Sequence, residues 1–71
     1  MDKILLRRIM KQQGLTQEKL AERIGVDRST FNRKVNGHHK GFCIVEVSAI
    51  GKVLQLSKEQ MLNVFFNHMG S

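Results

Sequence analysis

The chain has 71 residues, of which 41% are hydrophobic, and it carries a formal net charge of +6 with one cysteine. This length allows a single domain, and the apolar content suits a packed globule rather than a disordered tail. A lone Cys43 excludes an internal disulfide and a multi-thiolate metal site, and no apolar run reaches the ~20 residues of a membrane-spanning helix. We therefore expect a protein of the reducing cytoplasm, held together by helix packing.

The charge is distributed unevenly along the chain. Residues 1–40 contain ten Lys or Arg against four Asp or Glu, whereas residues 41–71 contain two of each sign. A one-sided basic balance suits a polyanionic partner such as nucleic acid. From charge alone, a basic surface that only keeps the protein in solution is an equal alternative.

Five helices and no strands are predicted, at residues 2–13, 17–24, 28–36, 43–55 and 58–66. The first begins at Asp2, whose carboxylate suits free helix N–H groups, and Gly14 is placed to end it. Its buried stripe is predicted from helical spacing to contain Ile4, Leu5, Ile9 and Met10.

The second and third helices are predicted to form a closely joined pair. Thr16 and Asp27 are their expected N-caps, and Gly25 and Gly37 are their expected stops. One side of the pair is expected to be buried through Leu20, Ala21, Ile24, Phe31 and Val35.

The fourth and fifth helices follow a loop at residues 38–42. Gly51 inside the fourth weakens it by about 1 kcal/mol relative to Ala. The fifth opens with a capping box from Ser57 to Gln60. Ile44, Val47, Ile50 and Leu54 are expected to form the buried stripe of the fourth helix, and the apolar residues of the fifth are Met61, Leu62, Phe65 and Phe66. Phe65 and Phe66 cannot both face one core, so core packing and subunit contact are equally open for them.

Residues 15–37 carry the functional information. The turn at residues 25–27 is too short for antiparallel helices, so the two helices must cross steeply, which is helix-turn-helix geometry. The small Ala21 suits the point of closest approach. The side chains left outward on the second helix of the pair are polar or cationic: Arg28, Ser29, Thr30, Asn32, Arg33 and Lys34.

This segment resembles the lambda-repressor-like helix-turn-helix family, also called the Cro/C1 or XRE family. The resemblance rests on Leu15-Thr16-Gln17, Leu20-Ala21, Ile24-Gly25-Val26, Ser29-Thr30-Phe31 and Asn36-Gly37. The family has five helices, so the resemblance implies one all-α domain over residues 1–71, with the helix-turn-helix at helices two and three.

The resemblance also implies roles for individual residues. Base contacts are expected from Arg28, Ser29, Thr30 and Arg33, and phosphate contacts from Gln17 and Asn36. Apart from the resemblance, Lys40 in the loop, with His38 and His39, is a further candidate for phosphate contact. A helix fits the major groove, and an arginine there donates two parallel hydrogen bonds to guanine O6 and N7. We therefore expect at least one G·C pair per half-site.

The chain departs from the family pattern at two points. Lys34 and Val35 stand where an aliphatic or aromatic residue and a Glu are common, which puts in question an ion pair between that Glu and an arginine of the first helix. Lys34 is instead free to contact phosphate. Asp27 is an unusual cap so close to DNA, and we interpret it as trading some affinity for helix stability.

These observations predict a phage or prokaryotic transcriptional regulator of Cro/repressor type, cytoplasmic and associated with the nucleoid. Its partner is expected to be double-stranded DNA, bound by a homodimer on an inverted repeat, with recognition helices about 34 Å apart and Phe65 or Phe66 at the subunit contact. No enzymatic motif, cofactor site or small-molecule site is recognised. His38 and His39 lack the partners of a metal site, and Cys43 suits a half-buried apolar position better than a redox switch.

Two alternatives remain open. An antitoxin or another protein-interaction module can share this fold, because a fold does not fix a function. The chain can also be the DNA-binding part of a longer regulator.

Overall fold

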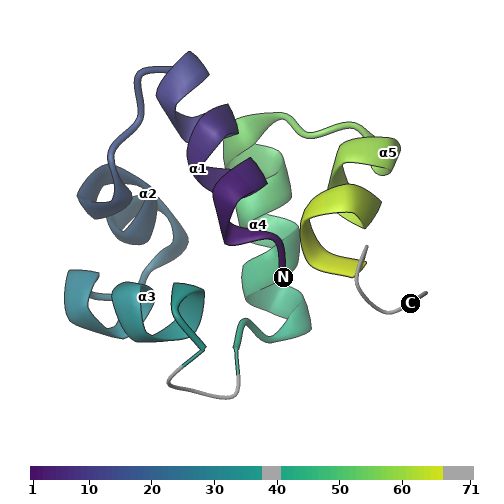
Figure 1. Cartoon of the computed structure of the whole chain (residues 1–71). Helices are drawn as coiled ribbons and strands as arrows, with labels where there is room; N and C mark the ends of the chain where they lie inside the picture. Colours follow the sequence, from purple (N-terminus) through teal and green to yellow (C-terminus); the bar gives the residue numbers. More distant parts are fainter. Residues whose placement is uncertain (38–40, 67–71) are drawn as a thin grey trace.

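The computed structural model describes residues 1–37 and 41–66. These residues form α1 (Lys3–Gln12), α2 (Gln17–Ile24), α3 (Arg28–Val35), α4 (Ile44–Leu54) and α5 (Lys58–Met61), and α5 continues as a π-helical turn, η1 (Leu62–Phe66). Figure 1 shows α1 and α4 in the middle, with α2 and α3 on one side and α5 with η1 on the other. The expected all-helical, five-helix fold is confirmed.

Four of the helix starts follow the capping chemistry expected from the sequence. Asp2 and Thr16 accept the N–H of the third helical residue beyond them, at 3.0 and 3.2 Å. Ser57 accepts the Gln60 N–H at 3.1 Å, and the Gln60 side chain accepts the Ser57 N–H at 2.9 Å. The fourth such cap, at Asp27, belongs to the candidate site below. Each cap pairs a donor that the helix leaves unpaired, so these bounds are set by local sequence.

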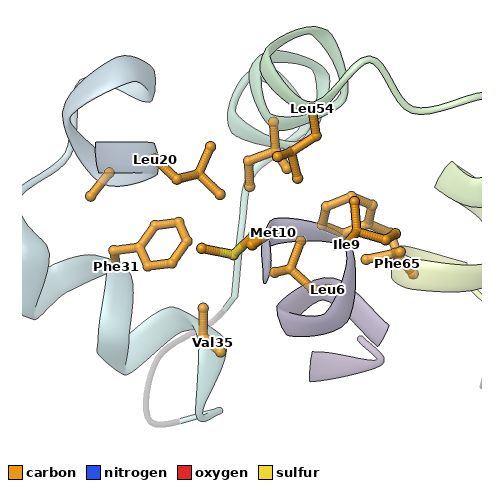
Figure 2. Packing of buried hydrophobic residues seen from close by; sticks show 11 residues of the cluster. Leu6, Ile9, Met10, Leu20, Phe31, Val35, Leu54 and Phe65 are labelled. Carbon is orange, nitrogen blue, oxygen red and sulfur yellow. The ribbon is translucent and has the colours of Figure 1, made fainter. Parts of the chain in front are cut away.

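The core lies where α1 meets the other helices (Figure 2). Its largest fully buried side chains come from every long helix and from η1: Leu6, Leu20, Phe31, Ile50, Leu54 and Val64. Ile9, Met10, Ala21, Val35 and Phe65 complete this cluster. The expected burial of Ile9, Met10, Phe31 and Val35 is therefore confirmed, and Ile24 and Val47 pack partly buried against the cluster.

Two residues expected in the core are on the surface. Ile4 is 67% exposed, because α1 turns Leu6, Ile9 and Met10 inward and Ile4 lies roughly 200° around the helix from Leu6. Ile44 is 79% exposed, because it is the first residue of α4 and the buried stripe of that helix starts one turn later. In α1 the predicted stripe is therefore confirmed at Ile9 and Met10 and in part at Leu5, but Ile4 is wrong and Leu6 takes its place in the core.

Gly51 lies inside α4 at the contact with α5. A Cβ atom added there would stand 2.7 Å from the Met61 sulfur and 3.0 Å from its terminal methyl carbon. The helix-weakening glycine therefore gives the Met61 side chain room to lie against α4. This packing works against the cost of about 1 kcal/mol in helix propensity.

The two adjacent phenylalanines at the end of η1 differ in their exposure to solvent. Phe65 is only 8% exposed and belongs to the core, whereas Phe66 is 42% exposed. Leu62, one turn earlier, is also exposed, while Val64 is fully buried. Of the two alternatives left open by the sequence, core packing holds for Phe65, and Phe66 remains available for a contact with another molecule.

Candidate nucleic-acid interface

The two helices of the motif are locked together at their turn. Gly25 ends α2 with a left-handed backbone (φ 83°), and the Val26 N–H donates to the Ala21 carbonyl at 3.0 Å. Ala21 is almost fully buried, as expected for the point of closest approach between the helices. Phe31 and Val35 face the core from α3, so the opposite side of that helix is left to solvent.

The outer face of α3 gathers most of the residues expected to contact bases. Arg28, Ser29 and Arg33 line one open hollow on the surface. Asn32 lies in the same hollow and had been given no role. Its place four residues after Arg28 is the helical spacing that identifies it as part of this face.

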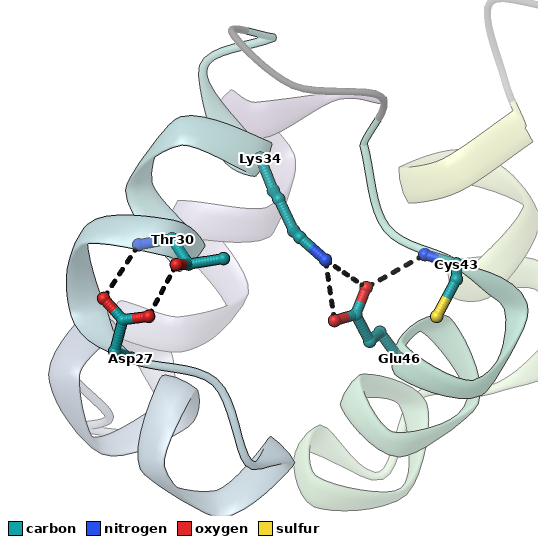
Figure 3. A network of polar contacts seen from close by, with 5 residues as sticks. All are labelled: Asp27, Thr30, Lys34, Cys43 and Glu46. Carbon is teal, nitrogen blue, oxygen red and sulfur yellow. Dashed lines mark hydrogen bonds and ion pairs between the residues drawn. The ribbon is translucent and has the colours of Figure 1, made fainter.

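Asp27 caps α3 and binds the first-turn hydroxyls. Its carboxylate accepts the Ser29 hydroxyl and the Thr30 hydroxyl, each at 2.5 Å, and the Thr30 backbone N–H at 3.3 Å. Figure 3 shows the two bonds from Thr30. The hydroxyl bond from Ser29, followed by those from Thr30, holds the pKa of the Asp27 carboxyl far below its usual range. The cap is therefore an ionised acceptor at neutral pH.

Arg28 is held only loosely within the protein. Its guanidinium lies 3.9 Å from the Glu18 carboxylate, which belongs to the first turn of α2, and both side chains are largely exposed. Exposed pairs of this kind contribute about 0–1 kcal/mol. Arg28 therefore remains available to an external acceptor.

Gln17 lies at the start of α2 in a second hollow. Arg7 and Lys11 of α1 line that hollow together with Gln17. Two cations beside a helix N-terminus suit an anion. Arg7 and Lys11 were missed as site residues, although their i, i+4 spacing places them on one face of the predicted first helix.

Lys34 has a partner inside the protein. Its ammonium nitrogen lies 2.7 Å from both carboxylate oxygens of Glu46 on α4, and the two side chains are only 12% and 14% exposed (Figure 3). The Phe42 ring lies on its other side, with 5.9 Å between the ammonium nitrogen and the ring centroid. This arrangement argues against the phosphate contact expected for Lys34.

Glu46 is fixed from two directions. Besides Lys34 it accepts the Cys43 backbone N–H at 3.0 Å, which caps α4. The Lys34 hydrogen bond is the main cause that lowers the pKa of Glu46 below its usual value. The family's expected ion pair has no counterpart at Val35, which is buried and apolar, whereas the Lys34–Glu46 pair bridges α3 and α4. Cys43 itself is exposed, so the half-buried position expected for it is wrong.

The remaining expected phosphate contacts divide into two groups. The Asn36 side-chain amide donates to the Asn32 carbonyl at 2.9 Å and also to the Asn32 side-chain oxygen, so it extends the end of α3. His38, His39 and Lys40 lie outside the described residues.

The segment that contains α2 and α3 matches a known protein family. The family model described as helix-turn-helix matches residues 6–40, a range that contains all of α2 and α3. Residues 6–40 belong to the Cro/C1-type helix-turn-helix family. It is a family of DNA-binding regulators, and the five-helix arrangement fits its lambda-repressor-like fold. No curated protein and no solved structure gave a significant match. Among the helices of the described residues, none is long and apolar enough to span a membrane.

Proposed function

We propose that this helix-turn-helix protein is a sequence-specific transcriptional regulator of Cro/repressor type, with α3 as the recognition helix in the major groove. The observation that carries the proposal is the outer face of α3, where Arg28, Ser29 and Arg33 line one open hollow. An α-helix fits the major groove, and its first residues approach the base edges. The family match makes DNA the polyanion that this face fits best.

Arg28 and Arg33 are the proposed guanine contacts. Each can donate two parallel hydrogen bonds to guanine O6 and N7, and neither is held by a strong internal partner among the described residues. Ser29 and Thr30 complete the proposed base-contact group. Both of their hydroxyls are hydrogen-bonded to the Asp27 carboxylate. Asn32 is added to the group because it lines the same hollow as Arg28, Ser29 and Arg33.

The proposed phosphate contacts flank the recognition helix. Gln17 is the central one, supported by Arg7 and Lys11 in the same hollow. Asn36 at the end of α3 is kept as a further proposed phosphate contact, and Lys40, which lies outside the described residues, is kept on the sequence alone. Lys34 is left out, because Glu46 already binds its ammonium group.

A homodimer on an inverted repeat is part of the proposal. One recognition helix contacts few bases, and a dimer doubles them with half-sites about 34 Å apart. Phe66 and Leu62 are the proposed subunit contact, because they are exposed apolar side chains on η1 while Phe65 is used in the core.

Selection of bound DNA from a random duplex pool, followed by footprinting, tests the proposed function directly. We expect an inverted repeat with at least one G·C pair per half-site. Affinity should fall with salt at a log–log slope of about −0.9 per phosphate neutralised. A pool without enrichment together with a flat salt titration would rule out DNA as the partner.

A protein-interaction role, as in an antitoxin, is the second candidate. It is favoured by Ile44 and Val45, two strongly exposed apolar side chains at the start of α4. The same selection separates the two candidates, since a protein-binding module needs no base preference.

A further inference from the structure

The hydroxyl protons of Ser29 and Thr30 have fixed destinations. Asp27 is ionised, and an ionised carboxylate can only accept hydrogen bonds. Each hydroxyl has one proton, and each lies 2.5 Å from a different Asp27 oxygen. Both hydroxyls must therefore be donors to Asp27.

A hydroxyl in that state offers only lone pairs to an outside partner. In the major groove, the hydrogen-bond donors are the amino groups adenine N6 and cytosine N4. Guanine O6 and N7 and thymine O4 are acceptors, and they would meet the hydroxyl lone pairs with no proton between them. Ser29 is the residue concerned most directly, because it lines the outer hollow of α3 while Thr30 is half-buried.

We propose that Asp27 is a specificity-determining residue: by binding the hydroxyl protons of Ser29 and Thr30, it makes Ser29 an acceptor and directs this turn of α3 to adenine or cytosine. The inference rests on the proposed function, since it assumes that α3 enters the major groove. It assigns opposite preferences to neighbouring residues. Arg28 donates and selects guanine, whereas Ser29 accepts and selects a base with an amino group.

A plain helix cap is the competing explanation for Asp27. Asp27→Asn separates the two roles, because asparagine caps helices about as well as aspartate. Its carboxamide has one oxygen, and its NH₂ group donates. It therefore cannot accept from both hydroxyls and the Thr30 N–H as the carboxylate does, and at least one hydroxyl becomes free to donate.

Glu18→Gln is the matched control. It removes one negative charge at the neighbouring start of α2, beside Arg28, and among the described residues Glu18 has no hydroxyl partner. Both variants should bind DNA somewhat more tightly, because each removes repulsion from phosphate. Only Asp27→Asn should alter base preference.

The experiment is random-pool selection with four proteins: wild type, Asp27→Asn, Glu18→Gln and Ser29→Ala. We expect the wild type to prefer adenine or cytosine by about tenfold at one half-site position. Ser29→Ala should abolish the preference at that position alone. Asp27→Asn should admit guanine or thymine there, and Glu18→Gln should keep the wild-type pattern.

Two results would overturn the inference. One is a wild-type preference for guanine or thymine at the position that Ser29→Ala changes. This result can be obtained even if Asp27→Asn does not fold. The other is an Asp27→Asn pattern identical to that of Glu18→Gln, with both proteins folded by circular dichroism. Failure of the proposed function is distinguishable, because the wild type would then enrich no sequence.

Discussion

The Lys34 ammonium group is bound by both carboxylate oxygens of Glu46 at 2.7 Å, in a contact that is almost closed to solvent. The pair connects α3 with α4 and is flanked by the Phe42 ring. A charge pair at this depth is sensitive to loss of one partner, because the other charge stays desolvated.

Glu46→Gln should therefore destabilise the fold by about 2 kcal/mol, which is the cost of a lost hydrogen bond to a charged group and less than that of breaking a fully buried ion pair. Urea unfolding followed by circular dichroism measures the change. Glu59→Gln, at an exposed carboxylate on α5, is the control and should shift stability by less than about 0.5 kcal/mol. The double change Lys34→Met with Glu46→Leu should recover most of the loss. Equal stability of Glu46→Gln and Glu59→Gln would contradict a structural role for the pair.

Acid should destabilise the protein through Glu46 and Asp27. The pKa of each carboxyl is lowered in the folded state, so the unfolded chain binds more protons as the pH falls. The stabilisation is complete above the ordinary pKa values, 4.5 for Glu46 and 3.8 for Asp27, and is lost below them as the folded-state carboxyls protonate. Thermal melts between pH 7 and 3 should show Tm falling from about pH 5 downward. Glu46→Gln should reduce the fall of Tm in the upper part of this pH range. If its Tm instead falls in parallel with that of the wild type, Glu46 is excluded as a source of the acid sensitivity.

Loss of either arginine on the outer face of α3 should weaken specific DNA binding without unfolding the protein. Arg28→Ala and Arg33→Ala should each reduce operator affinity by about tenfold to a hundredfold, since a bidentate guanine contact is worth about 1–3 kcal/mol. Gel shift on the selected sequence measures this loss, and thermal melts should be unchanged. Lys58→Ala removes the same charge from α5, on the other side of the molecule (Figure 1), and should cost far less. If the three variants bind equally well, the assigned face is wrong.

The two exposed apolar pairs give different predictions for self-association. Leu62→Ser with Phe66→Ser should shift the protein from dimer to monomer in sedimentation equilibrium, because it removes the proposed contact on η1. Ile44→Ser with Val45→Ser is the matched change on α4 and should leave the dimer intact. The reverse pattern would move the subunit contact to α4.

The sequence predicted what depends on local chemistry. The N-caps Asp2, Thr16, Asp27 and Ser57 and the stop at Gly25 follow from backbone groups within a few residues, and the structure confirms them. The phase of α1 was less determined, because Ile4, Leu5 and Leu6 are consecutive and the inward one depends on the neighbouring helices.

The candidate site likewise has features that local sequence predicts and features that depend on the fold. Arg28, Ser29 and Arg33 share a face by helical spacing alone and could be predicted. The Lys34–Glu46 pair joins residues 12 positions apart across two helices, and no spacing rule indicates it. The direction of the Ser29 hydroxyl depends on the position of the Asp27 carboxylate, which only the three-dimensional structure provides.

The backbone bond from the Asp2 N–H to the Val64 carbonyl, 2.6 Å long, joins the first turn of the protein to its last described helix. The Gln13 side chain adds a second link, to the Leu54 carbonyl at 2.7 Å. A chain cut before residue 64 would keep α2 and α3 whole but would lack the acceptor for the Asp2 N–H, together with Val64 and Phe65 of the core. The last helix should therefore be needed for a stable helix-turn-helix, although residues 62–66 lie outside the motif itself.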